Sequence, residues 1–403
     1  MNHLKKDCQK GSCFVEKLLR VKVKTYFCQH ISFERKYKIY MISRNNYSNV
    51  DPIVKKIGKE YIVRSEKNGI TVYDNTTDQY VFYSSLLFDQ VSHIETSQDL
   101  RCFLQTHREC ISRDIDFSAP FRVNWLIENR CNLDCIYCFA SDKMMSHNSC
   151  DNRDYSVTVS LLKKLRIMNV SLTGGEPTLN PNLPNIVLKL SQFATVNIDT
   201  NGSIDCFDDS FIEILKHENV LVRISVDSFE NKIEDKVRPC KNKGSSSVII
   251  KKNIEKLIKN GVNILVHTVV TSYNLTHLHT LAQELKNLRV KRWHIYGVHK
   301  SLKCANFYDE IKINIDELAS VVENLKIEFS GLINISMFMD EKEYSANSIL
   351  FVDEQGRLFV DSIYDGVQFI DFGNLPPLKV VAYYLNIKSH CNDYLALDII
   401  GGD

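Results

Sequence analysis

The sequence lacks long apolar runs, and no stretch approaches the roughly 18 uninterrupted apolar residues of a membrane-spanning helix. Residues 1–20 also lack the apolar segment of a secretory signal. An excess of charge is missing too, since 50 Lys and Arg nearly cancel 49 Asp and Glu. No overall field therefore attracts nucleic acid or an anionic membrane. We expect a cytoplasmic protein without membrane or nucleic-acid partners.

Disulfide bonds are not expected, although the chain has 13 cysteines. Such a number suits a disulfide framework in a small secreted chain, whereas these cysteines are spread over 403 residues without an export signal. Reduced thiols and metal ligation are the better interpretation. Ten cysteines are expected to be free or packed thiols: Cys8, Cys13, Cys28, Cys102, Cys110, Cys150, Cys206, Cys240, Cys304 and Cys391.

The first part of the chain divides into two segments. Residues 1–40 show no sustained period of 2 or 3.6, so we expect a flexible extension, or a natural protein that starts at Met41. Residues 41–115 are expected to form a small β-rich domain. Its main signal is Asn68-Gly69 between β-branched runs, because both central residues of a tight hairpin turn need a positive φ. An antiparallel meander is predicted.

Residues 116–300 have the pattern of an α/β fold, in which short runs rich in Val and Ile alternate with segments whose apolar residues have helical spacing. Six strands are expected, at 121–129, 169–173, 194–200, 219–227, 262–270 and 290–298. Six β/α repeats predict parallel strands and a partial, TIM-like (β/α)6 barrel. In such a barrel the chemistry belongs on the loops after the C-terminal ends of the strands.

Residues 301–403 are too short for an independent enzyme domain and are expected to form an α+β cap on the barrel. A helix is predicted over 315–325, followed by two strands, ILFVDE and RLFVDS. The segment FGNL at 372–375 and an apolar helical stretch at 380–387 follow.

Three thiols stand at C-x3-C-x2-C spacing directly after the first barrel strand: Cys131, Cys135 and Cys138. Thiolates are the soft ligands that iron–sulfur clusters require, and three of them leave one iron of a cubane open. A zinc site is the alternative, with His147 or Cys150 as fourth ligand. Closed zinc sites usually pair two C-x2-C units, and this segment has one such unit.

The segment CNLDCIYC resembles the C-x3-C-x-aromatic-C signature of the radical S-adenosylmethionine (SAM) superfamily, with Tyr137 as the aromatic residue. The second strand ends in LTGGEPTLNP, where Gly174, Gly175, Glu176 and Pro177 resemble the G-G-E motif that binds the amino group of SAM. Glycines fit this role, since backbone without side chains can approach a small zwitterion.

Weaker resemblances lie at later strand ends. Asn201 belongs to IDTNG after the third strand, and Ser225 and Asp227 stand in ISVD, where the family binds the ribose or carboxylate of SAM. Ser and Asp at such places are also ordinary helix caps or turn formers. Arg238 and Asn274 resemble positions in peptide-modifying members.

The resemblance implies a [4Fe-4S] cluster that reductively cleaves SAM to a 5′-deoxyadenosyl radical, which abstracts hydrogen from a substrate. It also implies a reducing partner such as flavodoxin or ferredoxin. The protein would then place the substrate and exclude water, and it needs no acid–base pair, so no catalytic residue is assigned. The meander and the cap are the parts available to close the barrel mouth.

The tail resembles the SPASM or twitch arrangement of peptide-modifying members, but Asp361 and Ser362 stand where a cysteine is expected. Beyond residue 300 only Cys304 and Cys391 remain, too few for an auxiliary cluster held by four cysteines. We therefore expect one cluster, and a maturase that modifies a peptide or protein side chain. The meander could offer a peptide-docking edge.

Two other functions stay open. A nucleoside-, nucleotide- or tRNA-modifying radical enzyme would have a basic, aromatic-lined mouth. A non-catalytic iron–sulfur redox sensor would have no need to bind SAM, so the GGEP and ISVD segments argue against it.

Overall fold

The computed structural model describes residues 54–58, 60–112, 114–115, 119–139, 154–217, 219–242, 245–301, 303–338, 349–362, 366–370 and 385. Several predictions lie outside these residues: the extension 1–40 with Met41, the alternative zinc ligands His147 and Cys150, the FGNL segment, Cys391 and, apart from Leu385, the helix at 380–387. No helix among the described residues is both long and apolar enough to cross a membrane.

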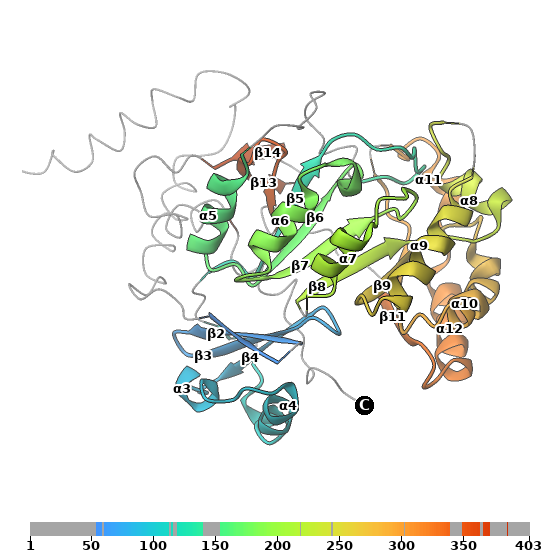
Figure 1. Ribbon diagram of the computed structural model, residues 1–403. Helices are drawn as coiled ribbons and strands as arrows, with labels where there is room; N and C mark the ends of the chain where they lie inside the picture. Colours follow the sequence, from blue (N-terminus) through green and yellow to red (C-terminus); the bar gives the residue numbers. More distant parts are fainter. Residues whose placement is uncertain are drawn as a thin grey trace, which may run out of the picture. The chain divides into compact units, whose positions relative to one another are not determined.

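The predicted meander is a four-stranded antiparallel sheet in the order β1-β2-β3-β4 (Figure 1). Its elements are β1 (Val54–Ile57), β2 (Tyr61–Glu66), β3 (Gly69–Asp74), β4 (Gln79–Ser84), α3 (Phe88–Val91), α4 (Ser97–Gln105) and η1 (Arg108–Cys110). Gly69 opens β3, where a Cβ would lie 2.1 Å from the carbonyl oxygen of Tyr83. Helix α4 begins after Thr96, whose hydroxyl accepts from the backbone N–H of Asp99 at 3.1 Å.

The barrel sheet has ten strands in the order β11-β10-β9-β8-β7-β6-β5-β12-β13-β14 (Figure 1). Its parallel strands are β5 (Arg122–Glu128), β6 (Asn169–Gly174), β7 (Thr195–Thr200), β8 (Val220–Ser225), β9 (Ile264–Val270), β10 (Arg292–Gly297) and β11 (Asn334–Phe338). The α/β prediction of a partial barrel is confirmed, and all six predicted strands are present. Strand β11 is an addition, because its sequence NISMF has no apolar run to mark it.

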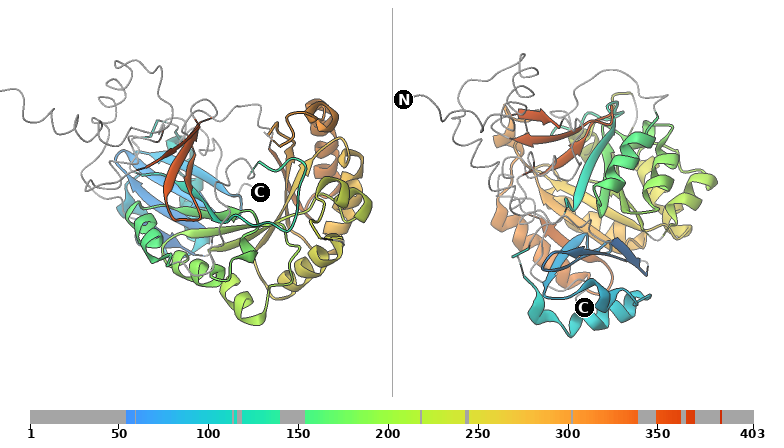
Figure 2. Two further views of the ribbon diagram at one scale, coloured as in Figure 1. Left: turned by 90° about the horizontal axis from the view of Figure 1, so that it is seen from above. Right: turned by 90° about the vertical axis from the view of Figure 1, so that its left-hand side faces the viewer.

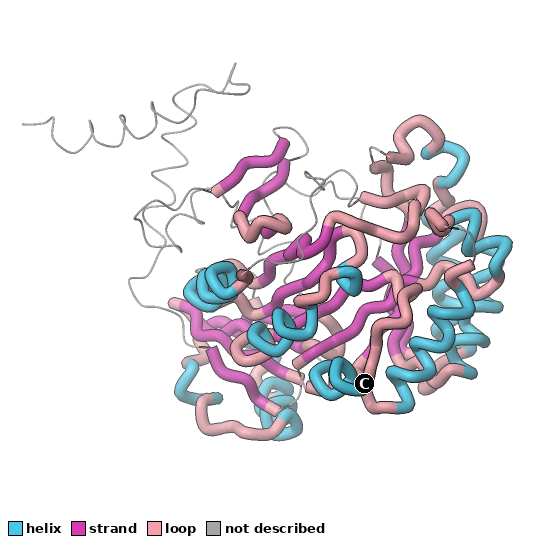
Figure 3. Tube along the Cα trace, turned by 45° about the horizontal axis from the view of Figure 1, so that its top comes forward, coloured by secondary structure: helices cyan, strands magenta, loops and turns pink. Residues whose placement is uncertain are grey.

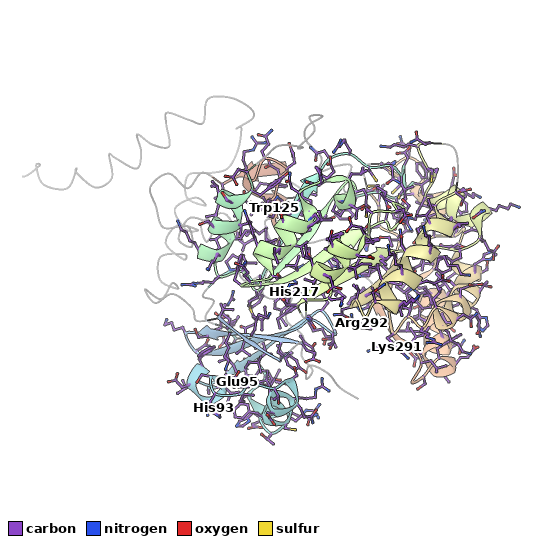
Figure 4. The ribbon with its side chains drawn as sticks, in the orientation of Figure 1. His93, Glu95, Trp125, His217, Lys291 and Arg292 are labelled. Carbon is purple, nitrogen blue, oxygen red and sulfur yellow. The ribbon has the colours of Figure 1, made fainter. Side chains whose placement is uncertain are left out.

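Helices cover the convex side of this curved sheet (Figures 2 and 3). Those that pack on the sheet are α5 (Ser156–Lys164), α6 (Leu183–Leu190), α7 (Asp209–Leu215), α9 (Ser247–Lys259), η4 (Leu275–His277), α10 (Leu278–Asn287) and α12 (Ile315–Glu328). Three further short helices, η3 (Pro177–Leu179), α8 (Asn231–Val237) and α11 (Tyr308–Ile311), lie in the connections after β6, β8 and β10. Alternate strand residues such as Trp125, Leu172 and Val222 pack against the apolar faces of the covering helices. Trp125, labelled in Figure 4, meets Tyr155 edge-on at 5.6 Å.

The tail extends the barrel sheet with β12 (Leu350–Val352), β13 (Leu358–Ser362) and β14 (Gly366–Phe369). Strand β12 pairs parallel to β5 and antiparallel to β13. The turn between β12 and β13 forms around Asp353, which accepts from the backbone of Gln355 at 2.9 Å and of Arg357 at 2.8 Å. The two predicted strands thus exist, and they add to the core sheet.

The meander packs against the N-terminal ends of the barrel strands. Arg64 of β2 donates to the carbonyl oxygens of Ala119 and Pro120, both at 2.8 Å, just before β5. Arg292, which opens β10 (Figure 4), donates to the carbonyl oxygen of Thr76 at 2.8 Å. Because the cysteines follow the opposite, C-terminal end of β5, the interpretation that the meander closes the barrel mouth is wrong.

The side chain of Asp78, in the turn between β3 and β4, forms ion pairs with residues of the barrel strands. Its carboxylate is 2.9 Å from Arg223 of β8 and 3.2 Å from Arg122 of β5. Arg223 also binds Asp199 of β7 with two guanidinium nitrogens. Burial alone would raise the pKa of Asp78, but Arg122 and Arg223 hold it well below its usual range.

Replacing Asp78 with asparagine is expected to lower the free energy of unfolding by about 3 kcal/mol at neutral pH, because two largely buried guanidinium groups lose a shared counter-charge. The folded-state pKa lies below the unfolded value, so this stabilisation is complete above roughly pH 4 and is lost as the pH falls through the folded-state pKa. The difference between wild type and variant in urea-induced unfolding should therefore shrink in acid.

The matched control is Asp309→Asn, which removes an exposed ion pair with Lys312. It should leave the unfolding midpoint unchanged. An equal effect of the two substitutions, or a difference that grows in acid, would contradict the assigned network.

Candidate functional site at the C-terminal end of the sheet

The three motif cysteines gather on one loop directly after β5. Cys131, Cys135 and Cys138 are half-buried, and the N–H of Cys138 donates to the carbonyl oxygen of Cys135 at 3.2 Å. Burial raises the pKa of Cys135 to about 12, against the lowering effect of Arg238. A bound metal would supply the positive charge that thiolates need at this depth.

A backbone strap fixes the cysteine loop from outside. The strap is residues 237–241, from the last residue of α8 onward. The N–H groups of Asp134 and Ile136 donate to the carbonyl oxygens of Pro239 and Val237 at 2.8 and 3.0 Å, and the N–H of Lys241 donates to the carbonyl oxygen of Asn132 at 2.9 Å. The protein itself therefore shapes the loop that presents the thiols.

The zinc alternative is not tested, because its fourth ligands His147 and Cys150 lie outside the described residues. Among the described residues, no group of three or more His, Cys, Asp or Glu side chains is close enough together to bind one metal ion, and this includes the three thiols. The donor chemistry that remains on the loop is three thiols, which suits an iron–sulfur cluster.

Gly174 ends β6 and Gly175 follows it, packed against the backbone of Glu128 and Arg130, just before the cysteine loop. A Cβ on Gly174, whose φ is +133°, would lie 2.2 Å from the carbonyl oxygen of Glu128, and one on Gly175 would lie 2.2 Å from that of Arg130. The N–H of Gly175 donates to the Glu128 carbonyl at 2.6 Å. These glycines are thus required by packing, a reason beyond the access to a zwitterion that the sequence indicates.

Glu176 links the C-terminal ends of β6 and β7 by hydrogen bonds. Its carboxylate is fully buried and accepts from the hydroxyls of Thr178 and Thr200 at 2.5 and 2.6 Å and from the N–H of Asn201 at 2.7 Å. Burial raises its pKa, and these hydrogen bonds oppose the rise. Pro177 follows as the first residue of η3. The geometry makes Glu176 a residue that positions the two loops.

The remaining predicted residues lie at neighbouring strand ends. The amide nitrogen of Asn201 is 3.9 Å from the Cys131 sulfur. Tyr137 donates its hydroxyl hydrogen to Asp227, which also accepts from the N–H of Val269 at 2.8 Å. Ser225 is half-exposed at the end of β8. The structure therefore brings together, after β5 to β8, all the residues that the sequence assigned to metal and cofactor.

Arg238 is more central than its sequence resemblance indicates. Its buried guanidinium pairs with Glu234 at 3.0 Å and donates to the carbonyl oxygens of Ser225 and Asn201. Asn274 is also buried, and donates to the carbonyl oxygen of Asp227 at 3.3 Å. Sequence reasoning missed Glu234. Its i, i+4 spacing to Arg238 was the available signal.

Sequence reasoning also missed the inner face of the sheet. Polar residues alternate with apolar ones along the strands, as Ser171, Asn197, Asp199 and Arg223 show. This period of 2 separates a helix-covered face from an inner face. It was visible in the sequence as polar positions within runs of Val and Ile.

Cys304 offers a test of the single-cluster expectation. It is fully buried, and its sulfur accepts from the N–H and hydroxyl of Ser301 at 3.2 and 3.3 Å. Cys304→Ala should leave the iron content per chain unchanged and destabilise the fold by about 1 kcal/mol, measured by iron analysis and thermal unfolding. A fall in iron content would show that this thiol holds a second cluster.

The sequence model of the Radical SAM superfamily matches residues 125–285. The chain is 25% identical over 260 residues to an S-adenosylmethionine-dependent nucleotide dehydratase of Fibrobacter sp. (strain UWH6), covering 59% of this chain and 76% of that protein. It is 24% identical over 225 residues to the antilisterial bacteriocin subtilosin biosynthesis protein AlbA of Bacillus subtilis (strain 168), covering 55% of this chain and 48% of AlbA. The chain thus spans about half the length of AlbA.

Among solved structures, Streptococcus suis SuiB bound to S-adenosylmethionine is similar with a TM-score of 0.58 at 13% identity, covering 83% of this chain and 89% of SuiB. SuiB is also known bound to its precursor peptide SuiA. At 13% identity, the similarity to SuiB shows that the two chains share a fold.

Proposed function

Because this chain belongs to the radical SAM superfamily of enzymes, whose cofactors are a [4Fe-4S] cluster and SAM, we propose that it is a maturase acting on a peptide or protein side chain. The observation that carries the proposal is the loop of three thiols, held by the strap 237–241 beside the strand ends of a parallel barrel.

The residues at this end of the barrel fit the two cofactors. Cys131, Cys135 and Cys138 would hold the cluster, since they are soft, half-buried donors on one loop. Once bound, the cluster and SAM supply reductive cleavage and hydrogen abstraction. The chain's own residues shape the site and keep water from the reacting atoms.

The proposed SAM site comprises residues with two kinds of role. Ser225 and the backbone of Gly174 and Gly175 would contact SAM, because they lie at the C-terminal ends of β8 and β6, the same end of the sheet as the cysteine loop. Other residues act indirectly, by hydrogen bonds that fix the loops: Tyr137, Glu176, Asn201 and Asp227. Pro177 fixes the backbone where η3 begins.

Relatives of two kinds bear on the substrate. AlbA is named for the biosynthesis of a bacteriocin, and SuiB has been captured with a precursor peptide; both favour a peptide. The nucleotide dehydratase, of which the chain covers 76%, favours a nucleotide. We place the peptide first, because the arginines of the inner face already have partners and so offer little to a polyphosphate. Arg122 and Arg223 pair with carboxylates, and Arg292 donates to carbonyl oxygens.

The proposal includes a reducing partner such as flavodoxin or ferredoxin, because the cluster needs an electron from outside the chain. It also includes a cytoplasmic location, where thiols remain reduced. A redox sensor without catalysis is the remaining function of another class.

The test is SAM cleavage in the presence of candidate substrates. Reconstituted protein with dithionite and SAM should form 5′-deoxyadenosine, and co-expression with a short peptide encoded beside its gene should change that peptide's mass. Consumption of a nucleotide, with the peptide unchanged, would contradict the maturase. A reduced cluster whose EPR signal does not respond to SAM would favour the sensor.

A further inference from the structure

Four rings stand together on the inner face of the barrel sheet, and we call them the ring cluster: His267 of β9, His294 and Tyr296 of β10, and Phe338 of β11. Tyr296 and Phe338 stack at 5.1 Å with 17° between their planes, and the two imidazoles stack at 5.5 Å with 12°. His294 and Phe338 are 4.7 Å apart, and His267 and Tyr296 are 5.2 Å apart. The rings form one continuous aromatic surface.

The most exposed ring of the cluster lies at the C-terminal end of its strand, since Phe338 is the last residue of β11. Phe338 is 37% exposed, and Tyr296 and His267 are half-buried. Central strands are normally closed on both faces in a parallel sheet. Partial exposure distinguishes Tyr296 from the fully buried, helix-facing Trp293 and Ile295 of the same strand.

Two imidazole nitrogens of the ring cluster lack hydrogen-bond partners within the described part of the chain. They are Nε2 of His267 and Nδ1 of His294, and both are buried. Burial lowers the pKa of both rings, that of His294 to about 4, so each neutral ring has one N–H donor and one acceptor nitrogen. Buried polar atoms without partners are rare, and mark places where a ligand or water completes the bonding.

The arginines beside the ring cluster already have partners. Arg122 and Arg223 face the carboxylates of Asp78 and Asp199 in direct ion pairs. Arg292 of β10 donates to the carbonyl oxygens of Asn75 and Thr76. A charged substrate group brought here would lose its hydration without gaining an opposite charge of its own, which is costly. The surface therefore favours an uncharged group.

We infer that the ring cluster receives an uncharged aromatic side chain with a hydrogen-bonding group, of the tyrosine or tryptophan type, from the substrate peptide. This inference rests on the proposed function and names its substrate class. The aromatic face of the guest stacks on Tyr296 and Phe338, and its hydroxyl or indole N–H bonds to an imidazole nitrogen.

The test measures binding of small probes to the reconstituted protein by saturation-transfer NMR. The dissociation constant of N-acetyl-L-tyrosinamide should rise about fivefold or more in Tyr296→Leu and in Phe338→Leu, as expected for loss of a stacking partner. Phe338 is partly exposed, so its variant should fold even if the other does not. Phe103→Leu, at a half-buried ring on α4, is the matched control and should leave the constant unchanged.

A second comparison isolates the hydrogen bond. Wild type should bind N-acetyl-L-tyrosinamide about fivefold more tightly than N-acetyl-L-phenylalaninamide, and His267→Phe should abolish that preference.

The outcomes separate this inference from the proposed function. Equal binding of the tyrosine probe by wild type and both ring variants would overturn the inference, while the maturase would still be tested by peptide modification. Tighter binding of guanosine, lost in Tyr296→Leu, would identify a nucleobase site and overturn both.

Discussion

Replacing Cys131, Cys135 and Cys138 together with alanine is expected to remove the cluster, from about four irons per chain to none, since three thiolates hold one cubane. The brown colour of the anaerobically purified protein and the formation of 5′-deoxyadenosine should disappear with it. The thiols are half-buried rather than core residues, so the variant should still fold. Iron analysis, visible absorption and circular dichroism measure the three quantities.

A matched control for the cysteine variant is Cys206→Ala, which removes another half-buried free thiol. Its iron content should equal that of wild type. Stoichiometric zinc in wild type, with iron absent after reconstitution, would contradict the assignment of the loop.

Adding one methyl group at Gly175 is expected to have the second large effect. In Gly175→Ala the new Cβ would meet the carbonyl oxygen of Arg130 at 2.2 Å, and this carbonyl belongs to the residue before Cys131. Relief of that collision must move the cysteine loop or the end of β6. We expect a loss of about 3 kcal/mol in stability, at the upper range for overpacking, together with a reduced iron content.

Gly297→Ala is the matched control, because a Cβ there meets its nearest neighbour at an ordinary 3.8 Å. Thermal unfolding and iron analysis should show little change for this variant. Normal iron content and stability in Gly175→Ala would mean that the packing between the two loops is less close than the structure describes.

The sequence could predict those parts of the site that follow from short-range patterns. The cysteine motif, the GGEP turn and ISVD each stand directly after a strand, and parallel strands place their C-terminal ends together. Their gathering was therefore predictable. The hydrogen-bond partners of Glu176 could not be predicted, because Thr200 and Asn201 lie at the end of the next strand, β7.

Contacts between distant segments were beyond sequence reasoning for the same reason. Asp78 and Arg223 are separated by 145 positions. The residues around the Thr77-Asp78 turn contain no pattern that predicts an ion pair inside a barrel. Strand β11 was missed because NISMF is short and polar at its start. Apolar patterns of period 2 and 3.6 predict single strands and helices, and they do not predict contacts between distant elements.

The ion pairs of Asp78 also decide how this chain can be divided. A fragment starting at residue 116 would keep Arg122, Asp199 and Arg223 but lose Asp78, and so place two guanidinium groups opposite one carboxylate. An uncompensated charge at this depth opposes folding. The barrel thus depends on the carboxylate of Asp78, which belongs to a turn that precedes the first barrel strand, β5. Exchanging the N-terminal sheet for that of a relative requires an acidic residue at the same turn.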